Sequence, residues 1–292
     1  NCDWSSDVCS SDLSPGAPPP TDVLLIAPLA AAAPELHSTH QIGIASFPLG
    51  AQYIFEEEVR FPLWGSDNPL LRDAAVSVFA HAELTPSFPR VGPVVRIAPV
   101  AFWDATFRLW GTWYFGAFSS ILPFDDPEAA ATAEVKRAVV ASGARSGGLG
   151  IRADAETRLK GKVGPVIAVL EVSYRRHHVE AFETDLDYFW EPTEMLLVPA
   201  DGAVLNRNAY LFGELRKPTA EDDRKLWIGA VAFWQLALGT QDENLRIGPV
   251  AFWKPAVGPN VPTMIIGSQA WVESRFVEPL PPYTFVAASW AR

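Results

Sequence analysis

The sequence predicts an all-β fold of about twelve long antiparallel strands with one helical insertion near residues 127–141. Residues 149–160 alternate strictly between apolar odd and polar even positions, which is the period of a strand with one apolar and one polar face. Weaker alternation recurs along the chain, and segments rich in Gly, Pro and Asp separate the runs. No apolar run reaches the ~18–20 residues that a membrane-spanning helix needs.

The strands are expected from these alternating runs. In 75–84, for example, Val76 and Val78 share one face, and Ser77 and His81 share the other. In chain order, the expected strands are 50–62, 75–84, 90–103, 105–118, 149–160, 163–175, 186–198, 203–215, 225–238, 244–254, 263–276 and 282–291.

One insertion carries helix signals instead. Asp126 is a good N-cap residue, Pro127 suits the first helical position, and Ser142–Gly143 suits the helix end. The run between them favours a helix over about 127–141, which is short of a membrane span.

Two short motifs recur without constant spacing. Val-Ala-Phe-Trp begins at Val100, Val231 and Val250, and Gly-Pro-Val contains Pro93, Pro165 and Pro249. Irregular spacing excludes a solenoid and suggests hairpins built from similar strands. Pro93 and Pro165 are expected near strand starts, where a missing N–H is tolerated, whereas Pro249 falls nearer mid-strand.

The N-terminal region is not expected to belong to the fold. Residues 1–13 resemble the conceptual translation of a sequencing adapter, and both cysteines, Cys2 and Cys9, lie there. Residues 14–36 have the apolar core and small residues of a signal-peptide remnant, with cleavage near Ala33, or form a disordered Pro/Ala-rich tail. A single β domain is expected over 37–292.

Charge and composition restrict the classes of function. The formal net charge is −11, which argues against a nucleic-acid partner, because such proteins carry basic surfaces. No zinc, nucleophile-elbow or dinucleotide-binding signature is present, so no metal and no cofactor is expected, and an enzyme is the less favoured interpretation.

Long strands, aromatic residues at strand ends and charges that alternate within apolar runs favour a membrane location. The aromatic ends are Phe102–Trp103, Trp113–Tyr114, Tyr188–Trp190 and Phe252–Trp253. On these grounds, roughly residues 38–292 resemble a bacterial outer-membrane β-barrel; the resemblance is architectural and rests on no family motif. It implies an antiparallel transmembrane barrel in the cell outer membrane, with outer-membrane lipid and the barrel assembly machinery as partners.

The expected role is passive. The barrel would be porin-like or structural, with small solutes or ions as cargo. Its charge-lined lumen would be formed by Arg96, Arg108, Arg152, Asp154, Glu156, Arg158, Glu273 and Arg275. Strand counting from a periplasmic C-terminus would put the helical insertion inside, whereas the usual loop rule puts long insertions outside. A miscounted strand would resolve this conflict.

Two alternatives remain open. Ser77, His81 and Glu83 share a strand face and suggest an outer-membrane lipid-modifying hydrolase. Strand residues four apart are ~13 Å apart, however, whereas a nucleophile and its base need ~3 Å. The other alternative is a soluble periplasmic or secreted β-barrel that binds an apolar ligand.

Two groups of side chains in the sequence are possible metal ligands. His177 and His178 are adjacent, and adjacent strand residues point to opposite faces, so they cannot chelate one ion. Glu183, Asp185 and Asp187 would share a strand face, where an acidic solvated rim is favoured over a divalent cation site.

Overall fold

The computed structural model describes residues 33–46, 49–64, 66–116, 121–129, 133–143, 146–183, 185–191, 193–217, 222–258, 261–274 and 282–291. Both cysteines and most of the expected leader lie outside these residues. The elements are β1 (Glu35–Ser46), β2 (Leu49–Pro62), β3 (Ala75–Leu84), β4 (Pro89–Val100), β5 (Trp103–Tyr114), β6 (Leu122–Phe124), α1 (Ala133–Ala141), β7 (Gly148–Val163), β8 (Val166–Ala181), β9 (Tyr188–Glu191), β10 (Leu196–Pro199), β11 (Asp201–Arg216), β12 (Lys225–Leu238), β13 (Glu243–Lys254), β14 (Thr263–Ser274) and β15 (Tyr283–Ala291).

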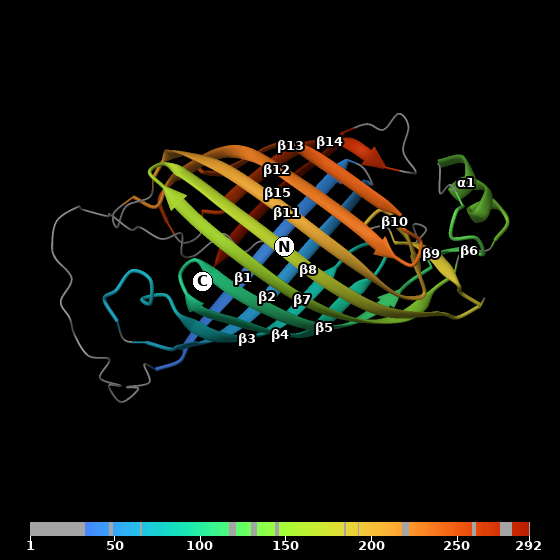
Figure 1. The fold of residues 1–292 in the computed structure, drawn as a ribbon, viewed down its shortest axis with the longest axis horizontal. Coiled ribbons are helices and arrows are strands. Elements are labelled where there is room, and N and C mark those ends of the chain that lie inside the picture. The colour runs from blue at the N-terminus through green and yellow to red at the C-terminus, as the bar shows by residue number, and fades with distance from the viewer. Residues whose placement is uncertain are drawn as a thin grey trace.

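Twelve strands close into one antiparallel barrel (Figure 1). Each barrel strand pairs with the next barrel strand along the chain, and β1 pairs with β15 from Thr39 opposite Ala291 to Ala45 opposite Phe285. The predicted all-β barrel of about twelve antiparallel strands with one helix is therefore confirmed. Closure leaves no unpaired sheet edge in the wall.

One predicted barrel strand is wrong. Residues 186–198 form the short hairpin β9–β10, which pairs with β6 in a separate three-stranded sheet. Its two halves pair with each other over four residues, Leu196 opposite Glu191 to Pro199 opposite Tyr188, which is far shorter than a strand of the barrel wall. The twelfth barrel strand is β1, which the prediction omitted because polar Ser38 and His40 interrupt its outward apolar face.

This correction changes the end of the barrel at which the helix lies. Seven barrel strands, rather than eight, follow α1, so α1 lies at the end opposite the start of β1 and the end of β15 (Figure 1). The conflict between strand counting and the long-loop rule disappears. The connection from β5 to β7 and the connection from β8 to β11 both lie at the α1 end.

The helix is shorter than predicted. Its described residues are Ala133–Ala141, whereas residues 127 and 128 form a turn in which Asp126 accepts a 2.8 Å hydrogen bond from the Glu128 N–H. It ends at Ala141, and Gly143 follows with a φ of +80°, the left-handed conformation that glycine adopts easily and that the sequence predicted for the helix end. Val139 and Val140 pack on the apolar cluster of the three-stranded sheet. No helix among the described residues is long and apolar enough to cross a membrane.

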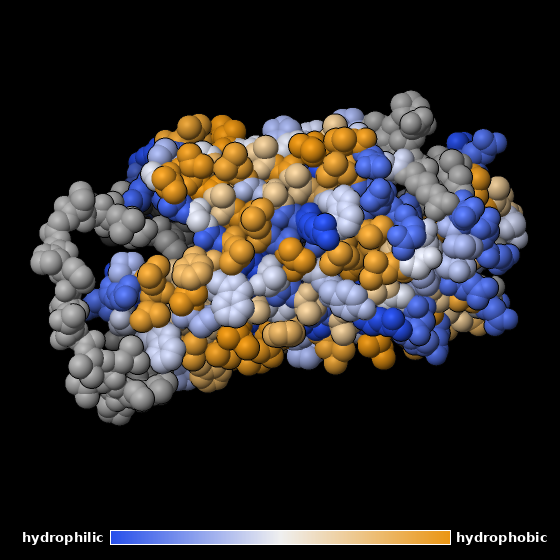
Figure 2. Space-filling view, in the orientation of Figure 1, coloured by the Kyte–Doolittle hydropathy of each residue, from blue (hydrophilic) through white to orange (hydrophobic). Residues whose placement is uncertain are grey.

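The outer wall of the barrel is apolar. Exposed large apolar side chains lie on each barrel strand from β1 to β14, and Figure 2 shows them as a broad zone over the barrel wall, with hydrophilic residues gathered at the α1 end. Trp103, Trp113 and Trp253 are exposed near strand ends, as the aromatic pattern predicted. The cluster Tyr188–Trp190 is an exception, because it lies in β9 within the end sheet rather than in the wall.

The repeated Gly-Pro pairs serve two purposes. Gly164–Pro165 connects β7 to β8, whereas Gly92–Pro93 and Gly248–Pro249 lie inside β4 and β13, contrary to the expectation for Pro93. A Cβ at Gly92 or Gly248 would lie 1.8 or 1.9 Å from a carbonyl O of the next strand. Only glycine permits this close approach. The pairing registers of β4 with β5 and of β13 with β14 skip both Gly-Pro pairs, so the missing proline N–H is harmless on that side of each strand.

Candidate functional site: the charged lumen

The lumen wall is built by the inward-facing positions of the strands. On β7, Asp154, Glu156 and Arg158 are buried inside the barrel, while Leu149 and Ile151 are exposed on its outside. The strict alternation of this segment therefore corresponds to two physically different faces. Arg152 also faces inward and lines an interior cavity.

The inward charges pair across neighbouring strands. Arg108 of β5 donates to Glu156 at 2.8 Å, and Trp110 donates to Asp154 at 3.0 Å. Arg158 pairs with Asp104 at 2.8 Å. In the register of β5 with β7, Arg158 lies directly opposite Asp104, whereas Arg108 and Trp110 each reach the β7 residue diagonal to them, so this register determines the pairs.

The other residues expected in the lumen are distributed differently. Arg96 lies over the Phe79 ring at 4.7 Å and lines the cavity, and no described carboxylate lies within ion-pair distance of it. Glu273 is exposed at the end of β14. Arg275 lies outside the described residues.

The polar residues of β3 do not assemble a hydrolase triad. Ser77, His81 and Glu83 are all buried and face the lumen. His81 Nδ1 pairs with Glu56 of β2 at 2.6 Å, whereas Glu83 accepts a hydrogen bond from Gln52 and pairs with Arg90. No serine hydroxyl hydrogen-bonds to His81 within the described part of the chain.

The acidic residues 183, 185 and 187 do not lie on a strand. Glu183, Asp185 and Asp187 are exposed in the connection between β8 and β9. His177 and His178 point to opposite sides of β8: His177 is buried and its Nε2 lies 2.8 Å from the Pro199 carbonyl O, while His178 is exposed. No group of three or more metal-ligating side chains occurs among the described residues.

The hairpin β9–β10 packs against the barrel at the α1 end (Figure 1). Leu196, Leu197 and Val198 are fully buried. The Leu197 N–H donates to Asp242 at 2.7 Å, and the Thr240 hydroxyl donates to the Leu197 carbonyl O at 2.7 Å. The hairpin is thus attached to the turn between β12 and β13.

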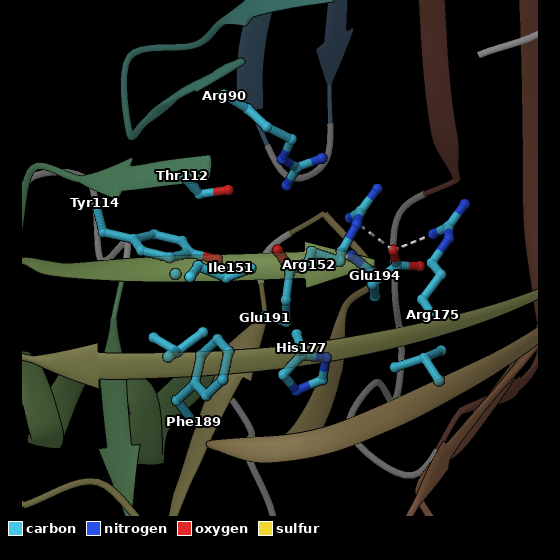
Figure 3. Close-up of a pocket in the computed structure, with 13 residues that line it drawn as sticks. Arg90, Thr112, Tyr114, Ile151, Arg152, Arg175, His177, Phe189, Glu191 and Glu194 are labelled. Atoms are coloured by element: carbon cyan, nitrogen blue, oxygen red, sulfur yellow. Dashed lines mark hydrogen bonds and ion pairs between the residues drawn. The ribbon is translucent and has the colours of Figure 1, made fainter. Parts of the chain in front are cut away.

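The turn of this hairpin inserts Glu194 into the charged wall (Figure 3). Its carboxylate forms an ion pair with Arg175 of β8 and lies 3.8 Å from Nη1 of Arg152 on β7. Gln235 of β12 donates to the same carboxylate, and Asn244 of β13 donates to the Glu194 carbonyl O at 2.9 Å. Four strands therefore hold one residue of the hairpin.

The two acids of the hairpin have opposite pKa shifts. Burial opposes ionisation of Glu194, but Arg175 and Arg152 hold its pKa below the usual range. Burial and the nearby Glu194 raise the pKa of Glu191. The Glu191 carboxylate accepts the Glu194 N–H at 2.7 Å, which fixes the turn.

A cavity of about 120 Å³ adjoins Glu194. Its charged lining comprises five arginines, five carboxylates and one histidine, namely Arg90, Arg96, Arg108, Arg152, Arg175, Glu56, Glu83, Asp154, Glu156, Glu194 and His81. Toward the opposite end, apolar side chains fill part of the interior: Ile167, Val169, Tyr210, Phe212, Trp227, Val231, Val250 and Phe252. The charged cavity thus lies between the hairpin at the α1 end and this apolar cluster.

Sequence reasoning did not identify the residues that connect the hairpin to the wall. The predicted strand 186–198 includes Glu194, which the structure instead places in the turn between β9 and β10. Arg175 alternates with apolar Val172 and Tyr174, which is the pattern that identified the lumen face of β7. Comparison with family models, with curated proteins and with solved structures gave no match.

Proposed function

We propose that this chain is an integral outer-membrane β-barrel that gives small solutes or ions a porin-like passage, and that the β9–β10 hairpin closes this passage in the present conformation. The observation that carries the proposal is the placement of the two faces of β7. Leu149, Ile151 and Leu159 are at least half exposed outside, while charged residues of the same strand are buried inside.

An apolar exterior of this extent favours lipid over water. The largest apolar patch on a typical soluble monomer is about 300–600 Å². Here the apolar zone extends over strand after strand (Figure 2). Burying it in lipid is favourable by about 25 cal/mol per Å². A closed barrel can enter lipid because its strands satisfy each other's backbone hydrogen bonds.

The same faces argue against a soluble barrel for an apolar ligand. Such a protein needs a polar exterior and an apolar interior, which is the reverse of the arrangement on β7 and β8. On β8, Leu170 and Val172 are exposed outside, while Glu171 and Ser173 are buried inside. The missing serine–histidine contact leaves the hydrolase alternative without support in the described residues.

The proposal includes an orientation. Outer-membrane barrels have short periplasmic turns and longer extracellular loops. The two longest connections, from β5 to β7 and from β8 to β11, both lie at the α1 end. We therefore orient this end toward the cell exterior, with outer-membrane lipid around the wall and insertion by the barrel assembly machinery.

The test of membrane residence is refolding of the full chain into detergent and into lipid vesicles. We expect the folded barrel to migrate differently on an SDS gel before and after boiling, and to float with the vesicles in a density gradient. A monodisperse sample without detergent, with no heat-dependent mobility, would contradict the proposal.

A further inference from the structure

The position of Glu194 is that of a bound carboxylate. Its side chain comes from a connection rather than from the wall. It reaches Arg175 and Arg152 (Figure 3) and also Gln235, which lie on three barrel strands. Guanidinium groups recognise carboxylates with paired, charge-assisted hydrogen bonds. Donors that served only the wall would pair with residues of the wall. Here three strands direct their donors at a residue of a connection instead.

Apart from Glu194, the wall around the cavity carries more positive than negative side chains. Five arginines line the cavity, but only four of its carboxylates belong to barrel strands. Each of these four already has a wall partner: Asp154 has Arg152, Glu156 has Arg108, Glu83 has Arg90, and Glu56 has His81.

Arg175 is the arginine that depends on the hairpin. Glu194 is the described carboxylate within ion-pair distance of it, and Arg175 keeps about 20% of its side chain exposed to the interior. Arg96, which lines the same cavity, has no described carboxylate partner. Withdrawal of Glu194 would therefore leave two arginines without a wall carboxylate beside a space of about 120 Å³.

We propose that Arg175, Arg152 and Gln235 form a binding site for small carboxylate anions, and that Glu194 occupies this site as an internal ligand while the lumen is closed. The inference rests on the proposed function, because it names the class of solute for the same lumen. An external carboxylate and Glu194 compete for the same donors, so binding of the solute and withdrawal of the hairpin are coupled. Such reciprocity follows from linkage.

The experiment measures binding of acetate to the full chain, folded in detergent, by calorimetry at constant ionic strength. Glu194→Gln removes the internal competitor, so we expect it to bind acetate at least tenfold more tightly than the wild type. The double variant Glu194→Gln with Arg175→Gln should lose this gain. Glu180→Gln, which changes an exposed carboxylate on the outward face of β8, should behave as the wild type.

A second measurement needs no substitution. In the wild type, acetate should displace Glu194 and accelerate amide hydrogen exchange of Leu196 to Val198 relative to chloride at equal ionic strength. Equal exchange in the two salts, or acetate binding that survives Arg175→Gln, would overturn the inference.

Failure of the site and failure of the membrane proposal are distinguishable. Gel mobility and vesicle flotation on the same samples report the membrane barrel and do not depend on acetate. A heat-modifiable barrel whose Glu194→Gln variant gains no acetate affinity would refute the anion site alone. Acetate binding by a protein that fails to associate with vesicles would refute the membrane role alone.

Discussion

Glu194, which lies in the connection after β8, forms an ion pair with Arg175 of β8 itself. Arg175 lies on β8, which ends at Ala181, and Glu194 lies in the turn between β9 and β10. In the proposed closed state, the hairpin is therefore held by a contact between one barrel strand and its own following connection.

The coupling between these two residues can be measured by a double-mutant cycle. The Glu194 side chain is about 4% exposed, so we expect Arg175→Gln and Glu194→Gln to show a coupling of about 1–3 kcal/mol in the free energy of unfolding from lipid vesicles. The adjacent outward pair Arg176–Asp201 is the control. Both of its side chains are more than half exposed, so its coupling should lie within about 0–1 kcal/mol. Equal couplings would show that Glu194 is not held as described.

The two faces of the wall can be separated by substitution. Ala155 faces outward between Phe107 and Tyr174. A lipid-facing arginine near the bilayer midplane costs about 2–4 kcal/mol, so Ala155→Arg should impair folding into vesicles. Glu156→Gln is a poor lumen control, because it leaves Arg108 without its carboxylate. Arg96→Gln is the better control and should cost less.

Fluorescence quenching checks the same assignment directly. With Cys2 and Cys9 replaced by serine, a fluorophore on a cysteine at position 155 should be quenched by bromine atoms on lipid chains. A fluorophore at position 96 should be protected from them. If neither position responds in folded, vesicle-associated protein, the outward face of β7 does not contact lipid.

The barrel could be predicted because its strands repeat a local pattern. In 149–160 every second residue is apolar, and this period determines which side chains share a face; the burial of Asp154 and Glu156 in the structure shows that the apolar face points outward. The hairpin could not be predicted in this way. Tyr188 to Trp190 and Leu196 to Val198 are β-forming apolar runs, and their burial against the barrel end is a tertiary effect.

The partners within the lumen depend on register. Sequence alternation places Arg108 and Glu156 on inward faces, but only the alignment of β5 with β7 brings them to 2.8 Å. The same holds more strongly for Glu194, whose contacts come from four strands that are distant in sequence. A single strand pattern contains no information on such contacts.

Gly92 and Gly248 are expected to be the wall glycines least tolerant of alanine. A Cβ at either position would lie within 2 Å of a backbone carbonyl O, which cannot move without shifting a strand. We expect each alanine variant to lose about 1–3 kcal/mol of unfolding free energy. Gly161→Ala in β7 is the matched control, because nothing lies within 4 Å of its added Cβ. Comparable losses in all three variants would point to strand flexibility instead of close packing.

Acid should open the lumen through Glu194. A carboxyl group with a lowered folded-state pKa stabilises the closed state above its unfolded pKa, about 4.3 for glutamate, and this stability is lost as the pH falls through the lower folded value. Glu191 has the opposite sign: its raised pKa makes the closed state more stable as the pH falls toward 4.3. The charged and titratable groups around Glu194 are Arg90, Arg152, Asp154, Arg175, His177, Glu191 and Arg246.

We therefore expect ion conductance across planar bilayers to stay low until the pH is below the ordinary glutamate range, and then to rise. Glu194→Gln should conduct at neutral pH and lose most of this acid response, whereas Glu180→Gln should keep the wild-type profile. An acid response that persists unchanged in Glu194→Gln would assign the opening to other carboxyl groups of the wall.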